Sequence, residues 1–310
     1  MYPGLHAQAR ADQPAIIMAG SGETVTYREL EARSNRFAHL LRVVGLKRRD
    51  HYAVFMENHP RFIESDAAGE RSGLYYTNVN SFLTAGELAY IVNNSLSKVL
   101  ITSQAKLEVA LSALRECPNV ELCLVVDGPG EGARVRNLGE ATAEFPISPI
   151  DDESPGAAML YSSGTTGRPK GILRPLYDHP VSEPHPVLPS YIKNWRFREG
   201  VTYLMPAPLY HSAPMVGAAG TIRLGGDAHR DGAVRRRALP ASYRETPRDP
   251  HPACADDVLA DAETAGSFAP AVRPLFARGG GARRRALSRS GERGDDRMVG
   301  AGHPRVLRRD

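Results

Sequence analysis

The sequence predicts an α/β fold in which parallel strands alternate with helices. Two helices are expected to begin at capping boxes, in which a threonine and the glutamate three residues later satisfy backbone N–H groups reciprocally: Thr26 with Glu29, and Thr84 with Glu87. Residues 120–126 are almost continuously apolar, which is typical of a strand buried on both faces of a sheet. Strands that alternate with helices in this way favour parallel pairing.

The first 160 residues supply these elements in order. The helix that follows Thr26 leads to a buried strand at residues 52–56. Asn58 can then cap, and Pro60 can open, a second helix, although its charged residues and Gly69 do not follow an amphipathic pattern. The further expected strands lie at residues 74–79, 98–102, 120–126 and 157–160, and the further expected helices begin at Thr84 and Leu107.

Composition indicates an ordinary globular protein, since 42% of the residues are hydrophobic. No apolar run approaches the ~18 residues of a membrane span, and the N-terminus lacks the pattern of a signal peptide. The three cysteines show no metal-ligand spacing and fit a reducing compartment. We therefore expect a cytoplasmic protein with no membrane span and no metal site formed by cysteines.

The formal net charge of +4 is distributed unevenly along the chain. Residues 1–226 contain 22 Lys and Arg against 23 Asp and Glu, whereas residues 227–310 contain 17 Arg, no Lys and 12 acidic residues. The first part therefore lacks the uniform basic surface typical of nucleic-acid binding, and no nucleic-acid partner is expected.

Residues 161–171, Tyr-Ser-Ser-Gly-Thr-Thr-Gly-Arg-Pro-Lys-Gly, follow a small apolar strand and are hard to explain by packing. Glycines let successive N–H groups point into one concavity, hydroxyl groups add donors, and Lys170 adds a positive charge, so the segment suits polyphosphate. The order G-x-x-x-x-G-K-[ST] is absent, which disfavours an unrelated P-loop protein. The alternative is an exposed, solvated loop.

The order of residues 161–171 resembles the signature phosphate loop of the adenylate-forming enzymes, which include acyl-CoA synthetases, luciferases and the adenylation domains of peptide synthetases. Weaker similarity at residues 75–88 and after Thr26 implies the same fold, the N-terminal part of the family's large domain, with mixed and parallel sheets flanked by helices. The chain is most similar to an acyl-CoA synthetase. By this resemblance, the ATP phosphates would be bound by Ser162, Ser163, Gly164, Thr165, Thr166, Gly167 and Lys170.

The resemblance implies an AMP-forming acid–thiol ligase, as in fatty acid metabolism. A small carboxylate, a fatty or other acyl acid, would react with ATP in the presence of Mg²⁺, and coenzyme A would then form the thioester. Residues 208–214, Pro-Leu-Tyr-His-Ser-Ala-Pro, resemble the motif beside the acyl-adenylate, where His211 would line the acyl pocket. Alternatively, His211 caps the helix that follows it, and the two roles are compatible.

The resemblance ends at Gly226, which divides the chain into residues 1–226 and residues 227–310. The second part contains no Ile, Lys, Asn or Gln and shows no sustained strand, so we expect a poorly structured tail. It could be an Arg-rich segment that binds nucleic acid or an anionic membrane, a poorly ordered native extension, or an out-of-frame translation of a GC-rich gene. The last hypothesis is favoured, and it predicts that another reading frame restores the family's motifs.

Several motifs that the family carries after the phosphate loop are not found. These are the adenine-binding segment, the magnesium segment, the Thr-Gly-Asp ribose contact, the hinge and the catalytic lysine. No catalytic residue and no metal ligand can therefore be assigned. We expect an acyl-CoA synthetase that is truncated and impaired as written, and the alternative is a non-catalytic fragment that retains only the phosphate loop.

Overall fold

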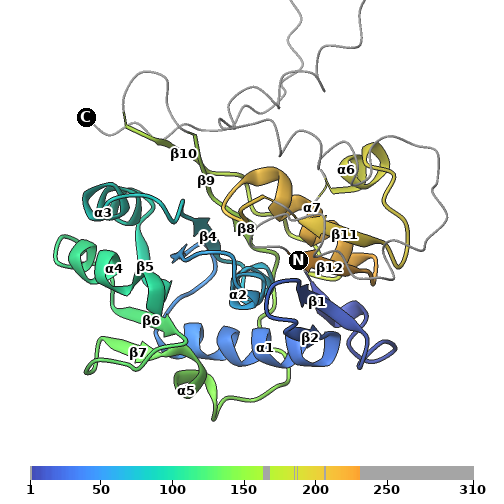
Figure 1. The fold of residues 1–310 in the computed structure, drawn as a ribbon, viewed down its shortest axis with the longest axis horizontal. Coiled ribbons are helices and arrows are strands. Elements are labelled where there is room, and N and C mark those ends of the chain that lie inside the picture. Colours follow the sequence, from blue (N-terminus) through green and yellow to red (C-terminus); the bar gives the residue numbers. More distant parts are fainter. Residues whose placement is uncertain (1, 163–167, 185, 187, 206, 231–310) are drawn as a thin grey trace, which may run out of the picture. The chain divides into compact units, whose positions relative to one another are not determined.

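A computed structural model describes residues 2–162, 168–184, 186, 188–205 and 207–230 (Figure 1). All of these residues belong to one compact unit. The expected tail lies outside the described residues from position 231 onward.

The larger sheet in the described part has six strands in the order β7-β6-β5-β3-β4-β8. Its strands are β3 (His51–Phe55), β4 (Tyr75–Asn78), β5 (Ser97–Ser103), β6 (Leu122–Val126), β7 (Val135–Asn137) and β8 (Ala157–Ala158). Every neighbouring pair is parallel, which confirms the expected pairing. All residues of β6 are buried, as its apolar run predicts.

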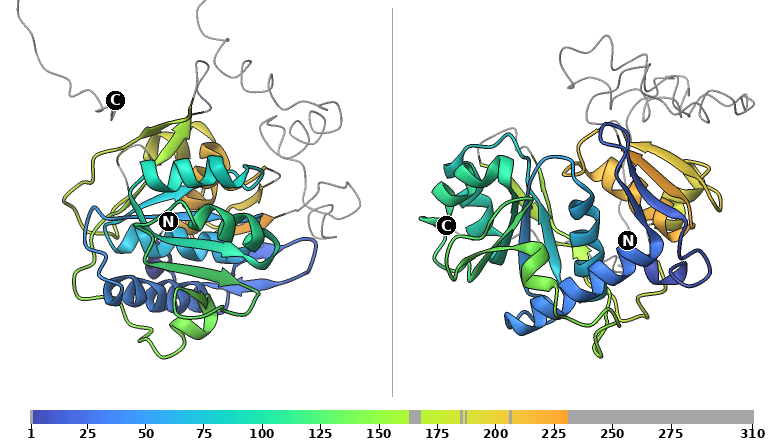
Figure 2. Two further views of the ribbon diagram at one scale, coloured as in Figure 1. Left: turned by 90° about the vertical axis from the view of Figure 1, so that its left-hand side faces the viewer. Right: turned by 60° about the horizontal axis from the view of Figure 1, so that its bottom comes forward.

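Helices cover both faces of this sheet (Figure 2). They are α1 (Tyr27–Val43), α2 (Pro60–Arg71), α3 (Ala85–Asn94), α4 (Leu107–Leu114) and α5 (Leu138–Thr142). Successive residues of β3 alternate between two cores: Tyr52 and Val54 pack with α1, α2 and α5, whereas Ala53 and Phe55 pack with α3 and α4. This alternation follows from the two-residue repeat of a strand.

Both capping boxes are confirmed. The Thr26 N–H donates to Glu29 Oε2 at 2.9 Å, and the Thr84 N–H donates to Glu87 Oε2 at 2.9 Å. These boxes fix the starts of α1 and α3 as the sequence predicts.

The expected cap of α2 is wrong. Because α2 begins at Pro60, His59 occupies the N-cap position, and its Nδ1 accepts a hydrogen bond from the Arg61 N–H at 3.1 Å. The Asn58 Oδ1 instead accepts from the Leu209 N–H at 3.3 Å. Asn58 thus ties the end of β3 to a distant segment of the chain.

The second sheet has the order β11-β12-β1-β2 among the described residues. Its strands are β1 (Pro14–Met18), β2 (Thr24–Thr26), β11 (Thr202–Met205) and β12 (Asp227–Arg230), and α6 (Leu188–Asn194) and α7 (Ser212–Arg223) complete this region. The expectation of no strand after Gly226 is therefore wrong for residues 227–230. Ala228 is buried and pairs with both Ile16 and Tyr203, so β12 is held between two neighbours.

Short 3-10 helices lie at Pro3–Leu5 (η1) and Gln104–Lys106 (η2). No helix in the described part of the chain has the length and apolar character that crossing a membrane would require.

Candidate functional site

The phosphate-loop segment begins and ends in an antiparallel hairpin. Strand β9 (Leu160–Ser162) pairs with β10 (Lys170–Ile172), and Ser162 lies opposite Lys170. Both residues are exposed, and the Lys170 ammonium has no hydrogen-bond or ion-pair partner among the described residues. Ser163, Gly164, Thr165, Thr166 and Gly167 lie outside the described residues. The structure thus brings together the first and last members of the expected site.

Helix α3 holds both ends of this loop. The Tyr161 hydroxyl donates to Asn94 Oδ1 at 2.7 Å, and the Tyr90 hydroxyl donates to the Pro169 carbonyl at 3.1 Å. The Arg168 guanidinium also lies over the Tyr90 ring, 5.0 Å from its centroid. Tyr90 and Asn94 are four residues apart and therefore share one face of α3.

The sequence does not single out Tyr90 and Asn94, because both are ordinary residues in a helical pattern. The only local signal is their spacing of one helical turn. The opposite face of α3 buries Leu88, Ile91 and Val92 against the sheet. The loop is therefore tied to an element that the core holds in place.

His211 occupies the N-cap position of α7, as one of its two interpretations predicts. Its side chain makes no capping hydrogen bond, so His211 occupies the N-cap position without satisfying a backbone N–H of the helix. Partial burial lowers the pKa of His211, which favours the neutral imidazole at pH 7. A role in an acyl pocket stays a prediction.

The start of α7 lies over the carboxyl ends of two strands of the larger sheet. Besides the bond from the Leu209 N–H to Asn58, the Asn78 amide contacts Met215 Sδ at 3.7 Å. These contacts place the segment on either side of His211 at the edge where open α/β sheets bind ligands.

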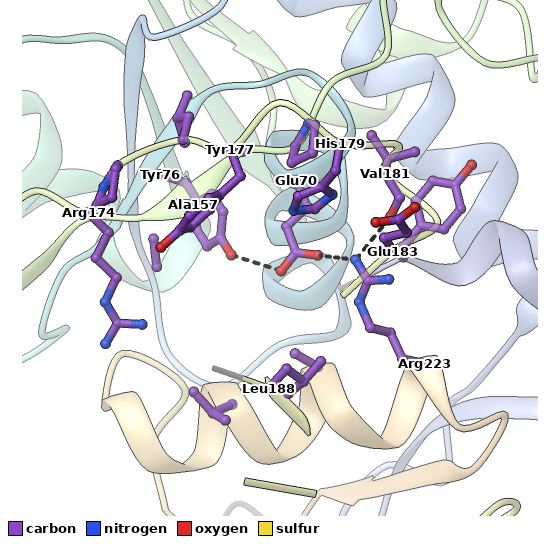
Figure 3. Close-up of a pocket in the computed structure, with 18 of the residues that line it drawn as sticks. Glu70, Tyr76, Ala157, Arg174, Tyr177, His179, Val181, Glu183, Leu188 and Arg223 are labelled. Atoms are coloured by element: carbon purple, nitrogen blue, oxygen red, sulfur yellow. Dashed lines mark hydrogen bonds and ion pairs between the residues drawn. The ribbon is translucent and has the colours of Figure 1, made fainter. Parts of the chain in front are cut away.

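Further along α7, a cavity separates this helix from β4 and β8 (Figure 3). Glu70, at the end of α2, lies 3.5 Å from Arg223 at the end of α7 and accepts a hydrogen bond from the Tyr76 hydroxyl at 3.3 Å. Burial lowers the pKa of Arg223 to about 10, so its guanidinium stays charged at neutral pH.

The described residues contain no cluster of metal-ligating side chains, that is, no group of three or more His, Cys, Asp or Glu side chains placed to bind a metal. Mg²⁺ in nucleotide sites is bound by one or two carboxylates together with substrate phosphates. No Mg²⁺ site is therefore assigned.

Burial raises the pKa of Cys123 to about 12, in keeping with an inert core thiol.

Comparison with known proteins identifies the family. Residues 5–243, which are more than half of the chain, match the family of AMP-binding enzymes. The chain belongs to this family, as the order of residues 161–171 indicates. The match continues beyond Gly226, in keeping with the position of β12 in the second sheet.

Curated relatives include two CoA ligases. The acetyl-coenzyme A synthetase of Magnetococcus marinus is 30% identical over 190 residues, which cover 54% of this chain and 29% of that protein. The 4-coumarate–CoA ligase 2 of Petroselinum crispum is 29% identical over 163 residues, which cover 52% of this chain and 30% of that protein. The match to this chain thus spans less than a third of either relative.

Solved structures share the fold. The N-terminal domain of FACL13 from Mycobacterium tuberculosis superimposes with a TM-score of 0.64 and 22% identity, covering 76% of this chain and 57% of that one. The anthranilate CoA ligase AuaEII, solved with anthranoyl-AMP, gives a TM-score of 0.64 at 21% identity, covering 73% and 43%. The expected fold, the N-terminal part of the large domain of such enzymes, is confirmed.

Proposed function

We propose that this chain is the ATP-phosphate-binding part of an AMP-forming acid–thiol ligase. The observation that carries the proposal is the hairpin β9–β10 in a chain of the AMP-binding family: it places Ser162 opposite Lys170, whose ammonium has no partner among the described residues. Ser163, Gly164, Thr165, Thr166 and Gly167 would complete the phosphate site by their N–H and hydroxyl groups.

The proposed role of this site is electrostatic positioning. The exposed ammonium of Lys170 can neutralise the β- and γ-phosphates while negative charge builds up on the departing pyrophosphate. The substrate carboxylate would attack the α-phosphorus to give acyl-AMP and pyrophosphate. Attack by the thiol of coenzyme A on the acyl carbon would then release AMP. The neutral imidazole of His211 would lie beside the acyl group.

The substrate class follows from the relatives, which are named for acetate and 4-coumarate as well as for longer acids. We propose a small carboxylic acid, a fatty or other acyl acid, as substrate, and a cytoplasmic location. Because the 310 residues contain none of the family's later motifs, we also propose that this polypeptide binds ATP but turns it over poorly. The second candidate function is accordingly a non-catalytic, phosphate-binding fragment.

Lys170→Ala should weaken ATP binding at least about tenfold, because a charge-assisted contact contributes roughly 1.5–3 kcal/mol and tenfold corresponds to about 1.4 kcal/mol. Calorimetric titration of the full chain with ATP measures this difference. Lys47→Ala is the matched control, since Lys47 is also exposed but lies in the turn before β3. Equal ATP affinity of Lys170→Ala and the wild type, or no ATP binding by either, would contradict the proposal.

Pyrophosphate exchange with varied carboxylates tests whether this chain turns ATP over. The impaired ligase and the fragment both predict little exchange by this chain. Clear turnover with one acid would identify an active ligase and its substrate, and would exclude the non-catalytic fragment.

Asn94→Ala and Tyr90→Phe should each reduce ATP affinity by roughly two- to tenfold, because each removes one hydrogen bond of about 0.5–1.5 kcal/mol that holds the loop. The same calorimetric titration applies. Asn93→Ala is a close control: its amide bonds the Glu116 carbonyl at 2.8 Å and does not contact the loop. If the Asn93 and Asn94 variants lose affinity equally, α3 acts only through overall stability.

A further inference from the structure

Four side chains from residues 6–27 bind the C-terminal end of α7 and the two glycines that follow it. The Tyr27 hydroxyl lies 2.7 Å from the Gly226 carbonyl and 3.1 Å from the Ile222 carbonyl, so its one hydrogen is shared between them. The other three bonds, each 2.9 Å long, join His6 Nε2 to the Arg223 carbonyl and the Arg10 and Gln13 side chains to the Gly225 carbonyl. These four residues form a clasp around a helix end, where carbonyls lack intrahelical partners.

The two glycines present their carbonyls to this clasp. Gly225 has a φ of 65°, the left-handed conformation that commonly follows the end of a helix and that glycine adopts without strain. A Cβ on Gly225 would lie 2.6 Å from Arg10 Nη1, and a Cβ on Gly226 would lie 2.0 Å from the Val201 carbonyl oxygen. The chain therefore turns tightly at the end of α7, directly against the clasp.

Tyr27 is the fully buried member of the clasp, whereas the other three side chains are partly exposed. Burial raises the pKa of Tyr27, so its hydroxyl keeps the hydrogen that it donates. Tyr27 is also the first residue of α1, and the capping box at Thr26 fixes the start of that helix. Its hydroxyl is thus a firmly held donor at the end of α7.

The sides of α7 offer few features that would stop the helix from sliding along its axis. Gly217 lies against the Tyr203 ring of β11, and Gly220 faces the Phe197 ring. A glycine has no side chain to interlock with a neighbouring element. The apolar contacts of α7 with the core are non-directional, and they involve Met215, Ala218 and Ile222. The clasp therefore supplies directional contacts that can fix the axial position of α7.

We propose that Tyr27 is a positioning residue that sets the place of His211 over the larger sheet. α7 has 12 residues, with His211 at its N-cap position, and it is about 18 Å long. A helix is stiff along its axis, and axial shifts of about 1–2 Å are typical of packed helices. A shift at the clasped end therefore moves His211 by the same distance. The role of His211 beside an acyl group rests on the proposed function, whereas its placement by Tyr27 does not.

Tyr27→Phe tests this role, because it removes only the hydroxyl. Proton NMR of the full-length chain follows the titration of His211, whose signal is identified by its absence in His211→Gln. Burial lowers the pKa of His211 in the wild type, so a shifted α7 should expose the imidazole and raise this pKa by about half a unit. Hydrogen exchange at the Leu224 and Gly226 amides should become about tenfold faster.

Tyr52→Phe is the matched control. Tyr52 is also fully buried, and its hydroxyl donates to the Ser65 carbonyl of α2 at 2.6 Å, so this variant loses a similar bond away from α7. It should change neither the pKa of His211 nor the exchange at Gly226. Equal changes in the two variants, or an unchanged His211 pKa in Tyr27→Phe, would refute the positioning role.

Gln13→Ala gives a second, milder variant of the clasp. It removes one hydrogen bond at a partly exposed position and should raise the pKa of His211 by a smaller amount. If Tyr27→Phe did not fold, an unchanged His211 pKa in Gln13→Ala would overturn the proposal. ATP affinity should be the same in Tyr27→Phe and the wild type, because the phosphate loop is held by α3. Absence of ATP binding in the wild type would count against the proposed function alone.

Discussion

Arg71→Ala is expected to lower the free energy of unfolding by about 3–5 kcal/mol, the usual cost of removing one partner of a buried ion pair. The Arg71 side chain is fully buried at the end of α2 and lies 2.7 Å from Glu31 Oε2 and 3.4 Å from Glu153 Oε1. Burial already raises the pKa of Glu153, and the charge of Arg71 opposes this shift, together with the hydrogen bond from Tyr2. Without Arg71, both carboxylates lose their cation, and a large hole opens beside them.

Urea unfolding at pH 7 measures this effect. Arg28→Ala is the control, since Arg28 pairs with Asp12 at 3.1 Å but both side chains are largely exposed, and such pairs contribute about 1 kcal/mol or less. A loss below about 1 kcal/mol for Arg71→Ala would mean that water enters and solvates the two carboxylates. The ion pairs would then not stabilise this corner of the fold.

Arg71 belongs to α2, the helix whose sequence fits an amphipathic pattern least well. The structure explains why: α2 is buried on almost all sides, so its charged residues need partners rather than solvent. Glu64 binds Arg33 at 2.9 Å and Arg61 at 2.7 Å. Hydrophobic periodicity cannot reveal such a helix, because Arg33, which neutralises the Glu64 carboxylate, lies 31 positions from Glu64 in the sequence.

The sequence predicts correctly those elements that depend on a few adjacent residues. It does not predict β12, which depends on distant partners. The capping boxes and the apolar run of β6 need only a few adjacent residues, and both are confirmed. Strand β12 was missed because it depends on β1 and β11 on either side of Ala228. Averaging the composition of residues 227–310 also hides a strand of four residues.

The candidate site shows the same difference between features that depend on adjacent residues and features that depend on distant ones. The order of residues 161–171 was enough to single out Ser162 and Lys170, which the hairpin places opposite each other. The residues that hold this loop could not be inferred, because Asn94 and Tyr161 are separated by 67 positions and Tyr90 and Pro169 by 79. The predicted chemistry depends on one short segment, whereas the positioning of that segment depends on its contacts with α3.

Packing at one glycine connects this scaffold to the proposed phosphate site. Gly156 immediately precedes β8, and its N–H donates to the Glu70 carbonyl at 2.8 Å. A Cβ at this position would lie 2.1 Å from the Gly69 carbonyl oxygen and 2.5 Å from that of Leu74. Both are backbone atoms, so no side-chain rotation can relieve the clash.

Gly156→Ala should therefore lower the free energy of unfolding by about 3 kcal/mol, the upper end of the usual cost of overpacking. Relief of the clash requires β8 to move away from α2 and β4, which displaces the Ala157 wall of the cavity and the start of β9. ATP affinity should consequently fall as well, and urea unfolding and calorimetric titration with ATP measure the two quantities.

Gly86→Ala is the control for this substitution. No atom lies within 4 Å of the added Cβ in α3, so stability should stay the same or rise by up to about 1 kcal/mol, with the ATP affinity unchanged. If Gly156→Ala also kept its stability within about 0.5 kcal/mol, the contact between β8 and α2 would have to be looser than these distances indicate. If stability fell but ATP affinity did not, β8 would not be the element that positions the phosphate loop, and the loop would depend on α3 alone.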